Sequence, residues 1–142
     1  MGYTNYFHTK NRKEINEVDF QNFMSETYKA VEILMQKGYK FLDDRINEKY
    51  KDIVDFKVKN QNEIWLNGVG DDGHETFLID FKDSWEFCKT ARKPYDLAVK
   101  VILILAEKHN ILKEKFSFDG DKNDIEFKDA EAFIKEFLWV AF

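Results

Sequence analysis

The segment that follows the only proline constrains the fold of this chain most strongly. From Leu97 to Ala106 every residue is apolar except Lys100. Pro94 suits the first turn of a helix, and the pattern predicts a helix from Pro94 to Lys108. A helix that is apolar on nearly every side needs other elements around it, because none of its faces is suited to water. We therefore expect this helix to be buried at the centre of the domain or of an oligomer.

Other segments show the patterns of amphipathic helices. Apolar residues recur at helical spacing over residues 18–35, and Gly38 follows as a stop signal. The next segment, 39–52, is predicted to form a shorter helix, and the segment 129–142 a last one. Asp83 and Glu86 have the spacing of a capping box, which predicts a short helix that breaks before Pro94.

Alternating polar and apolar residues predict strands at 3–7, 54–58, 64–66 and 77–81. Phe116 and Phe118 are predicted to pair with Ile125 and Phe127 in a hairpin. The chain has no break in composition, so we predict one α+β domain over residues 1–142. Its core is expected to be a mainly antiparallel sheet of five to six strands with helices packed on it, including the buried apolar helix after Pro94.

Charge and composition indicate the kind of partner. The formal net charge of −5 argues against binding to duplex nucleic acid or to anionic membranes. The single cysteine, the absence of a signal-peptide pattern and the shortness of the apolar runs favour a cytoplasmic protein.

Trp139 and Phe142 fall outside the apolar stripe of the last predicted helix. We expect them at a subunit interface of a homo-oligomer.

A basic block precedes the predicted Pro94 helix and is the first candidate site. Lys89, Arg92 and Lys93 lie just before the helix start, where free amides and the helix dipole attract anions. Thr90 and Tyr95 add hydroxyl donors to this set. The pattern predicts a phosphate site in an otherwise acidic chain. Alternatively, the cations only stabilise the end of the preceding short helix.

The N-terminal strand offers groups that suit a base or a sugar. A tyrosine ring can stack on any nucleobase, and an asparagine amide can bond a base edge or a ribose. We therefore add Tyr3, Asn5 and Tyr6 to the predicted ligand-binding residues. Packing of the rings in the core is the alternative.

The glycine-rich loop at 67–75 is the candidate metal site. Asp71, Asp72, His74 and Glu75 could supply oxygen and nitrogen ligands, although such residues also belong to ordinary turn chemistry. The glycines do not match a phosphate-binding P-loop. Cys88 has no histidine near it in sequence that would make it a nucleophile. We predict no catalytic residue, no bound metal and no cofactor.

Three blocks of sequence together suggest a family. They are GYTNYF at residues 2–7, NGVGDDGHETF at 67–77 and FCKTARKPYD at 87–96. These blocks resemble a family of small, uncharacterised phage-encoded proteins that begin with a GYT-(His or Asn)-Tyr block. Asn5 stands where a histidine is expected, which argues against a metal-binding or proton-carrying role at this position. The resemblance implies a phage accessory protein in an infected bacterium. Small phage proteins often block host defence, so an anti-defence role is expected from that origin.

The leading hypothesis is a non-catalytic protein that binds a small anionic ligand, with a nucleotide signal as the first candidate. The first alternative is an inhibitor that docks on a host defence protein through its acidic surface with Trp139 and Phe142. The second alternative is a metal-dependent nucleotide hydrolase that uses the loop at 67–75.

Overall fold

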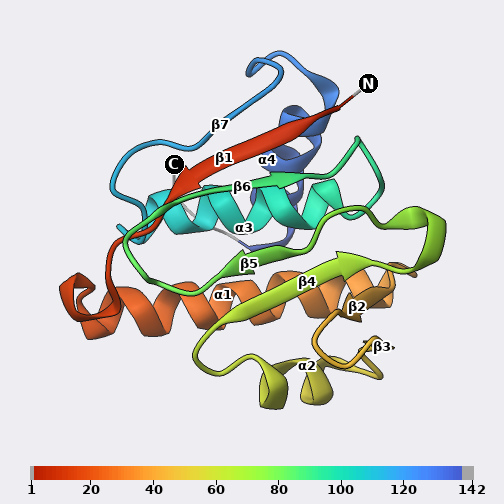
Figure 1. The fold of residues 1–142 in the computed structure, drawn as a ribbon, viewed down its shortest axis with the longest axis horizontal. Helices are drawn as coiled ribbons and strands as arrows, with labels where there is room; N and C mark the ends of the chain where they lie inside the picture. The colour runs from red at the N-terminus through yellow and green to blue at the C-terminus, as the bar shows by residue number, and fades with distance from the viewer. Residues whose placement is uncertain (1, 139–142) are drawn as a thin grey trace.

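The fold is seen in a computed structural model, which describes residues 2–138 (Figure 1). These residues form a single α+β domain. Its helices are α1 (Glu17–Gln36), α2 (Ile53–Lys59), α3 (Asp96–Lys108) and α4 (Ile125–Phe137). Its strands are β1 (Thr4–His8), β2 (Phe41–Asp43), β3 (Glu48–Lys49), β4 (Ile64–Gly68), β5 (Phe77–Ile79), β6 (Trp85–Lys89) and β7 (Ser117–Phe118). Within the described chain, no helix is both long and apolar enough to cross a membrane.

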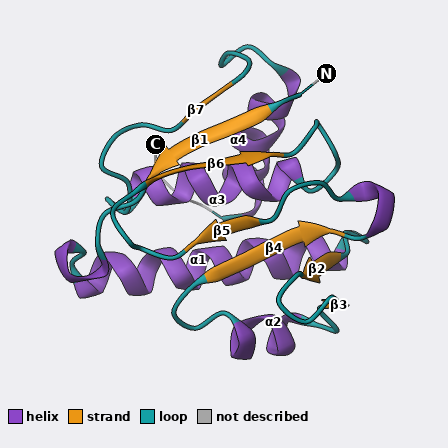
Figure 2. Ribbon diagram, viewed as in Figure 1, coloured by secondary structure: helices purple, strands orange, loops and turns teal. Residues whose placement is uncertain are grey.

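The strands form two small antiparallel sheets, not the single sheet of five to six strands that the sequence predicted. One sheet has the order β6-β1-β7 and the other β3-β2-β4-β5. β6 and β5 are the neighbouring strands of the two sheets in the view of Figure 2, and the amide of Glu75, just before β5, donates to the carbonyl of Lys89, at the end of β6, at 3.1 Å. In the described chain no ladder of hydrogen bonds pairs β5 with β6, so the two sheets are separate.

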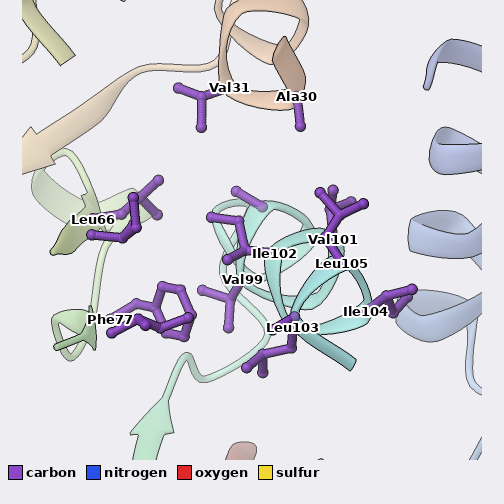
Figure 3. Close-up of a cluster of buried hydrophobic side chains, with 14 of the residues drawn as sticks. Ala30, Val31, Leu66, Phe77, Val99, Val101, Ile102, Leu103, Ile104 and Leu105 are labelled. Atoms are coloured by element: carbon purple, nitrogen blue, oxygen red, sulfur yellow. The ribbon is translucent and has the colours of Figure 1, made fainter. Parts of the chain in front are cut away.

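The helix after Pro94 is buried, as predicted. Every residue from Ala98 to Ala106 is buried, and even Lys100 is fully inaccessible. Val99 and Ile102 lie toward Leu66 and Phe77 of the larger sheet, whereas α1 lies over another side of the helix (Figure 3). The helix is surrounded because its apolar residues cover the whole circumference.

Helix α1 and strands β1, β4 and β5 confirm the predicted periodicities. The side chain of Asn16 caps α1 by accepting a hydrogen bond from the Val18 amide at 2.8 Å. Gly38 ends the helix with φ of 100°, a left-handed conformation that favours glycine. The turn directs the chain into Tyr39 and then β2.

The segments on either side of α2 correct two predictions. Residues 39–52 form the β2–β3 hairpin rather than a helix, and the left-handed Asn47 lies in its turn. Residues 53–59 form a helix rather than a strand, because the Asp52 side chain caps the amide of Asp55. In that helix Val54 and Val58 are exposed, so their alternation with polar residues was misleading.

Two further predictions were wrong. Asp83 does not cap a helix: its carboxylate pairs with His8 and Lys113, and the chain continues into strand β6 beside β1. Ile125 and Phe127 do not form a hairpin strand, because they belong to the first turns of α4. Instead, β7 pairs with β1. Local sequence could not reveal these pairings, since the partner strands are remote in the chain.

The turn between β6 and α3 contains two adjacent residues in the left-handed region. Ala91 and Arg92 have φ of 52° and 57°, and the Lys93 amide donates to the Thr90 carbonyl at 2.9 Å. Two positive φ values closed by this hydrogen bond are the features of a type I′ turn. Neither residue is glycine, so the backbone is strained there.

Replacing Ala91 with glycine is expected to stabilise the protein by about 0.5–1 kcal/mol, because glycine adopts a positive φ without a Cβ penalty. Urea denaturation measures the change. The control is Ala132→Gly on the exposed face of α4, which is expected to destabilise by about 1 kcal/mol. A loss of stability in the Ala91→Gly variant would contradict the strained turn.

Candidate functional site

The basic block and the N-terminal strand meet at a buried polar network of four side chains. Asp96, in the first turn of α3, accepts hydrogen bonds from Asn5 at 2.9 Å, Thr90 at 2.6 Å and Lys100 at 2.8 Å. The Lys100 ammonium also donates to the Asn5 side-chain oxygen at 2.9 Å. All four side chains are buried. The network therefore ties β1 and the turn before α3 to α3 itself.

Aromatic rings close the network. The Lys100 ammonium lies 4.2 Å from the centre of the Tyr3 ring and 4.7 Å from that of Phe118. Arg92 covers Tyr3 at 4.1 Å and pairs with Glu126 of α4. Burial lowers the pKa of Lys100, although Asp96 opposes this shift. Burial also raises the pKa of Tyr3, with a contribution from the Asp96 charge.

Four of the predicted ligand-binding residues are thus brought together. The polar groups of three of them bind the protein, whereas the buried Tyr3 hydroxyl has no hydrogen-bond partner among the described residues. Asn5 and Thr90 donate to Asp96, Arg92 pairs with Glu126, and Tyr3 packs between cations in the core. The geometry at these residues is that of a structural joint between β1, α3 and α4.

Lys100→Met is expected to destabilise the protein by about 3–5 kcal/mol, because it leaves the Asp96 carboxylate buried without its cation. Urea denaturation measures the loss, and Lys128→Met on the exposed surface of α4 is the control. Adding Asp96→Asn to Lys100→Met removes the unpaired charge, so the double variant should lose less than the two single losses combined. Strictly additive losses would mean that the pair does not act as a unit.

Two other predicted residues lie on the outer face of the smaller sheet. Tyr6 is opposite Phe87, and Lys89 is opposite Thr4 in the β1–β6 register. The Tyr6 hydroxyl donates to Asp119 at 3.0 Å. Tyr6 and Lys89 therefore point away from the polar network, and they share no cavity with Lys93 or Tyr95.

The last two predicted residues border open space beside Pro94. A cavity of about 520 Å³, here called the Pro94 cavity, lies between residues 37–41 after α1, the loop after β4, and Pro94 with Tyr95. Lys37, Lys40 and Asp72 are its charged lining residues. An adjoining cavity of about 180 Å³ shares Tyr39 and Pro94. Its charged lining residues are Lys93 and three carboxylates, Asp96, Glu126 and Asp129.

Tyr95 contributes its ring to the Pro94 cavity, whereas its hydroxyl is directed into the protein. The hydroxyl donates to the Glu75 carbonyl at 2.6 Å. Burial raises the pKa of Tyr95, so the phenol stays protonated as this donor. The same contact joins the glycine-rich loop to the basic block. All three sequence blocks that suggested a family therefore lie next to one another.

The glycine-rich loop owes its composition to tight backbone packing. A Cβ on Gly68 would lie 2.1 Å from the Asp72 carbonyl oxygen, and one on Gly73 would lie 2.4 Å from that of Gly68. The Asn67 side-chain oxygen accepts from the amides of Gly68 and His74, which fixes the loop. Among residues 2–138 no three metal-ligating side chains converge. The loop supplies a wall of the Pro94 cavity.

Cys88 lies on β6 and is fully buried, with its sulfur 4.0 Å from the Tyr95 hydroxyl oxygen. Burial raises the pKa of the Cys88 thiol to about 12. The thiolate is the reactive form of cysteine. The thiol is therefore protonated and inaccessible at neutral pH.

In a thiol-labelling assay at pH 8, folded protein should react at least about a thousandfold more slowly than urea-unfolded protein, because so little thiolate forms at a raised pKa. Labelling is unambiguous, since the chain has one cysteine. The rate should rise with pH toward 12 until the protein unfolds. Rapid stoichiometric labelling of folded protein at pH 8 would contradict the buried thiol.

The sequence analysis did not identify the residues that contribute most of the lining of the Pro94 cavity. Lys37, Tyr39 and Lys40 lie where the end of one helix and the start of another were predicted. Gly38 was the available signal, because a helix stop directs the chain into a turn. Asp96 was also missed, although Lys100 was visible as the one polar residue in the apolar run.

Comparison with known proteins identifies no relative of this chain. No protein-family model, no curated protein and no solved structure matches this chain.

Proposed function

We propose that the protein binds, without converting it, a small phosphate-bearing ligand such as a nucleotide in the Pro94 cavity. The observation that carries the proposal is the cavity itself, where the turn after α1, the glycine-rich loop and the basic block adjoin. Its volume of about 520 Å³ is within the range of small-molecule sites in proteins.

The charges around the cavity favour an anion, although the chain as a whole is acidic. Lys37 and Lys40 are exposed at the cavity and outnumber its one carboxylate, Asp72. A neighbouring cavity of about 400 Å³ shares Lys40 and adds Lys49 and Lys51, together with the carboxylates of Glu32 and Asp52. Ammonium groups bind phosphate as mobile point charges, and a local excess of them attracts anions despite the net charge.

Tyr39 supplies a surface for the base. Its ring is half-buried and stacks on Phe41, with 6.3 Å between ring centres and an angle of 19°. Stacking on an aromatic ring holds a base without selecting its identity. Lys37 and Lys40 flank this ring in sequence, so the base and phosphate of one nucleotide can be held by the same turn.

The ligand is held and not converted in this proposal. The titratable groups lining the Pro94 cavity include two lysines and Asp72, together with a Tyr95 hydroxyl committed to the Glu75 carbonyl. Among residues 2–138 no hydrogen bond or ion pair joins the Asp72 carboxylate to either lysine, so the groups lining the cavity are not arranged as an acid–base pair. The resemblance to phage-encoded proteins supports a role in an infected bacterium, where sequestering a nucleotide signal would blunt host defence.

The test is native mass spectrometry with a panel of mono-, di- and cyclic nucleotides, followed by calorimetry of the ligand that binds. The Lys37→Ala/Lys40→Ala variant should bind at least about tenfold more weakly, because each charge-assisted hydrogen bond is worth about 1.5–3 kcal/mol. Lys128→Ala, on the surface of α4, is the matched control and should bind normally.

A second variant distinguishes the Pro94 cavity from the site that the sequence predicted. Lys89→Ala/Arg92→Ala should leave affinity within about twofold, since these residues lie outside the cavity lining. If that variant loses binding while Lys37→Ala/Lys40→Ala keeps it, the ligand binds at the basic block. A protein that ignores the whole panel, or that changes the mass of a nucleotide, contradicts the proposal.

A further inference from the structure

The cavity of about 400 Å³ beside the Pro94 cavity lies where β2 and β3 approach the end of α1 (Figure 1). We call it the β3 cavity, because Lys49 of β3 and residues 50–53 after it line one part of it. Residues from the last turns of α1 line another part. Residues 38–41 line both the β3 cavity and the Pro94 cavity, so the two cavities meet at this segment.

The pairing of β2 places the two cavities on its two sides. Strand β2 lies between β3 and β4 in the larger sheet. On one side the Tyr50 amide donates to the Phe41 carbonyl at 2.9 Å, and on the other side Phe41 is paired with Gly68. Tyr50 lines the β3 cavity, whereas Gly68 lines the Pro94 cavity. A ligand that occupies both cavities therefore crosses residues 38–41.

Lysines continue from one cavity into the other. Lys40 lines both cavities. Lys37 lines the Pro94 cavity, and Lys49 and Lys51 line the β3 cavity. All four side chains are exposed, and among residues 2–138 none of them forms an ion pair with a carboxylate. Their charges are therefore available to an anion that extends across Lys40.

Two carboxylates also line the β3 cavity, Glu32 and Asp52. The Asp52 side chain caps α2, because it accepts a hydrogen bond from the Asp55 amide at 2.9 Å. The three lysines of the lining outnumber the two carboxylates, so the β3 cavity carries a net positive charge. A local excess of positive charge attracts anions even in an acidic chain.

The two cavities offer a ring surface for one base. Phe41, Tyr50 and Tyr95 are almost completely buried, with 1%, 3% and 1% of their surface exposed. Tyr39 is half-buried, and Phe41 stacks on its ring. Among the described lining residues Tyr39 alone therefore presents an aromatic face on which a base can stack. One base and a row of lysines fit a ligand with one nucleoside and several phosphates.

We propose that the ligand is a nucleoside di- or triphosphate whose phosphate chain extends from the Pro94 cavity across Lys40 into the β3 cavity. This inference rests on the nucleotide site proposed above and adds the β3 cavity to it. The base stacks on Tyr39, and the first phosphate lies near Lys37 and Lys40. The terminal phosphates lie near Lys49 and Lys51, which a monophosphate does not reach.

The experiment is calorimetric titration of the full chain with the mono-, di- and triphosphates of adenosine and guanosine. A chelator in the buffer prevents divalent ions from masking the phosphates. For at least one base the affinity should rise at least about tenfold from monophosphate to triphosphate, because one charge-assisted hydrogen bond contributes that much or more. Added salt should weaken the triphosphate more steeply than the monophosphate.

Two lysine pairs are tested separately. Lys49→Ala/Lys51→Ala should weaken triphosphate binding at least about tenfold and leave monophosphate binding within about twofold. Lys37→Ala/Lys40→Ala should weaken both. The matched control is Lys13→Ala/Lys128→Ala, which removes two exposed lysines outside both cavity linings and should bind all the nucleotides normally. Circular dichroism verifies that each variant is folded.

Equal affinity for the mono- and triphosphates would overturn the polyphosphate proposal and leave the nucleotide site in place. A triphosphate that binds Lys49→Ala/Lys51→Ala as tightly as the original chain would do the same. Tighter binding of a 5′-phosphorylated adenylate dinucleotide than of ADP would also overturn it, because both carry two phosphates and the second base would then be recognised. A chain that binds none of these nucleotides contradicts the proposed function together with this inference.

Discussion

Lys100 and Asp96 form an ion pair inside the most apolar helix of the protein, and the surrounding structure is arranged to satisfy it. An unpaired charge at this depth would cost several kcal/mol, about as much as the stability of a small domain. The Asn5 amide and the Thr90 hydroxyl complete the hydrogen bonding of the pair, and the Tyr3 ring covers the ammonium. The position of β1 against α3 therefore depends on these contacts.

The contacts around the Lys100–Asp96 pair also limit where a ligand can bind. They direct Asn5 and Thr90 inward, and Arg92 turns over Tyr3 to reach Glu126. The basic block is thereby used largely to connect elements, and open space remains on the other side of Pro94. There Lys37 and Lys40 approach from the turn after α1, which is remote from the block in sequence. The surface proposed for ligand binding is the cavity beside Pro94.

Much of the fold was predictable where one periodicity dominated. The buried helix around Lys100, the amphipathic α1 and the alternating β1 follow from burial of apolar side chains at a regular spacing. Predictions failed in short segments whose partners are far away. Val54 and Val58 alternate with polar residues as strand residues do. The segment is nevertheless a helix, because the Asp52 side chain caps it and Phe56 is its only buried residue. Asp83 resembles a cap, yet it pairs with His8 and Lys113.

The amino-acid sequence by itself determined the class of fold, the buried central helix and the residues of the basic block, because these depend on composition and local spacing. The tertiary structure alone decided which way the residues of that block face. Whether Thr90 meets a ligand or Asp96 depends on the pairing of β1 with β6, whose paired residues are 77 to 85 positions apart along the chain. Likewise, only the meeting of Lys40, Val69 and Pro94 creates a cavity, since its walls come from three separate segments. Local patterns do not contain such contacts, because they arise when the chain closes long loops to bury its core.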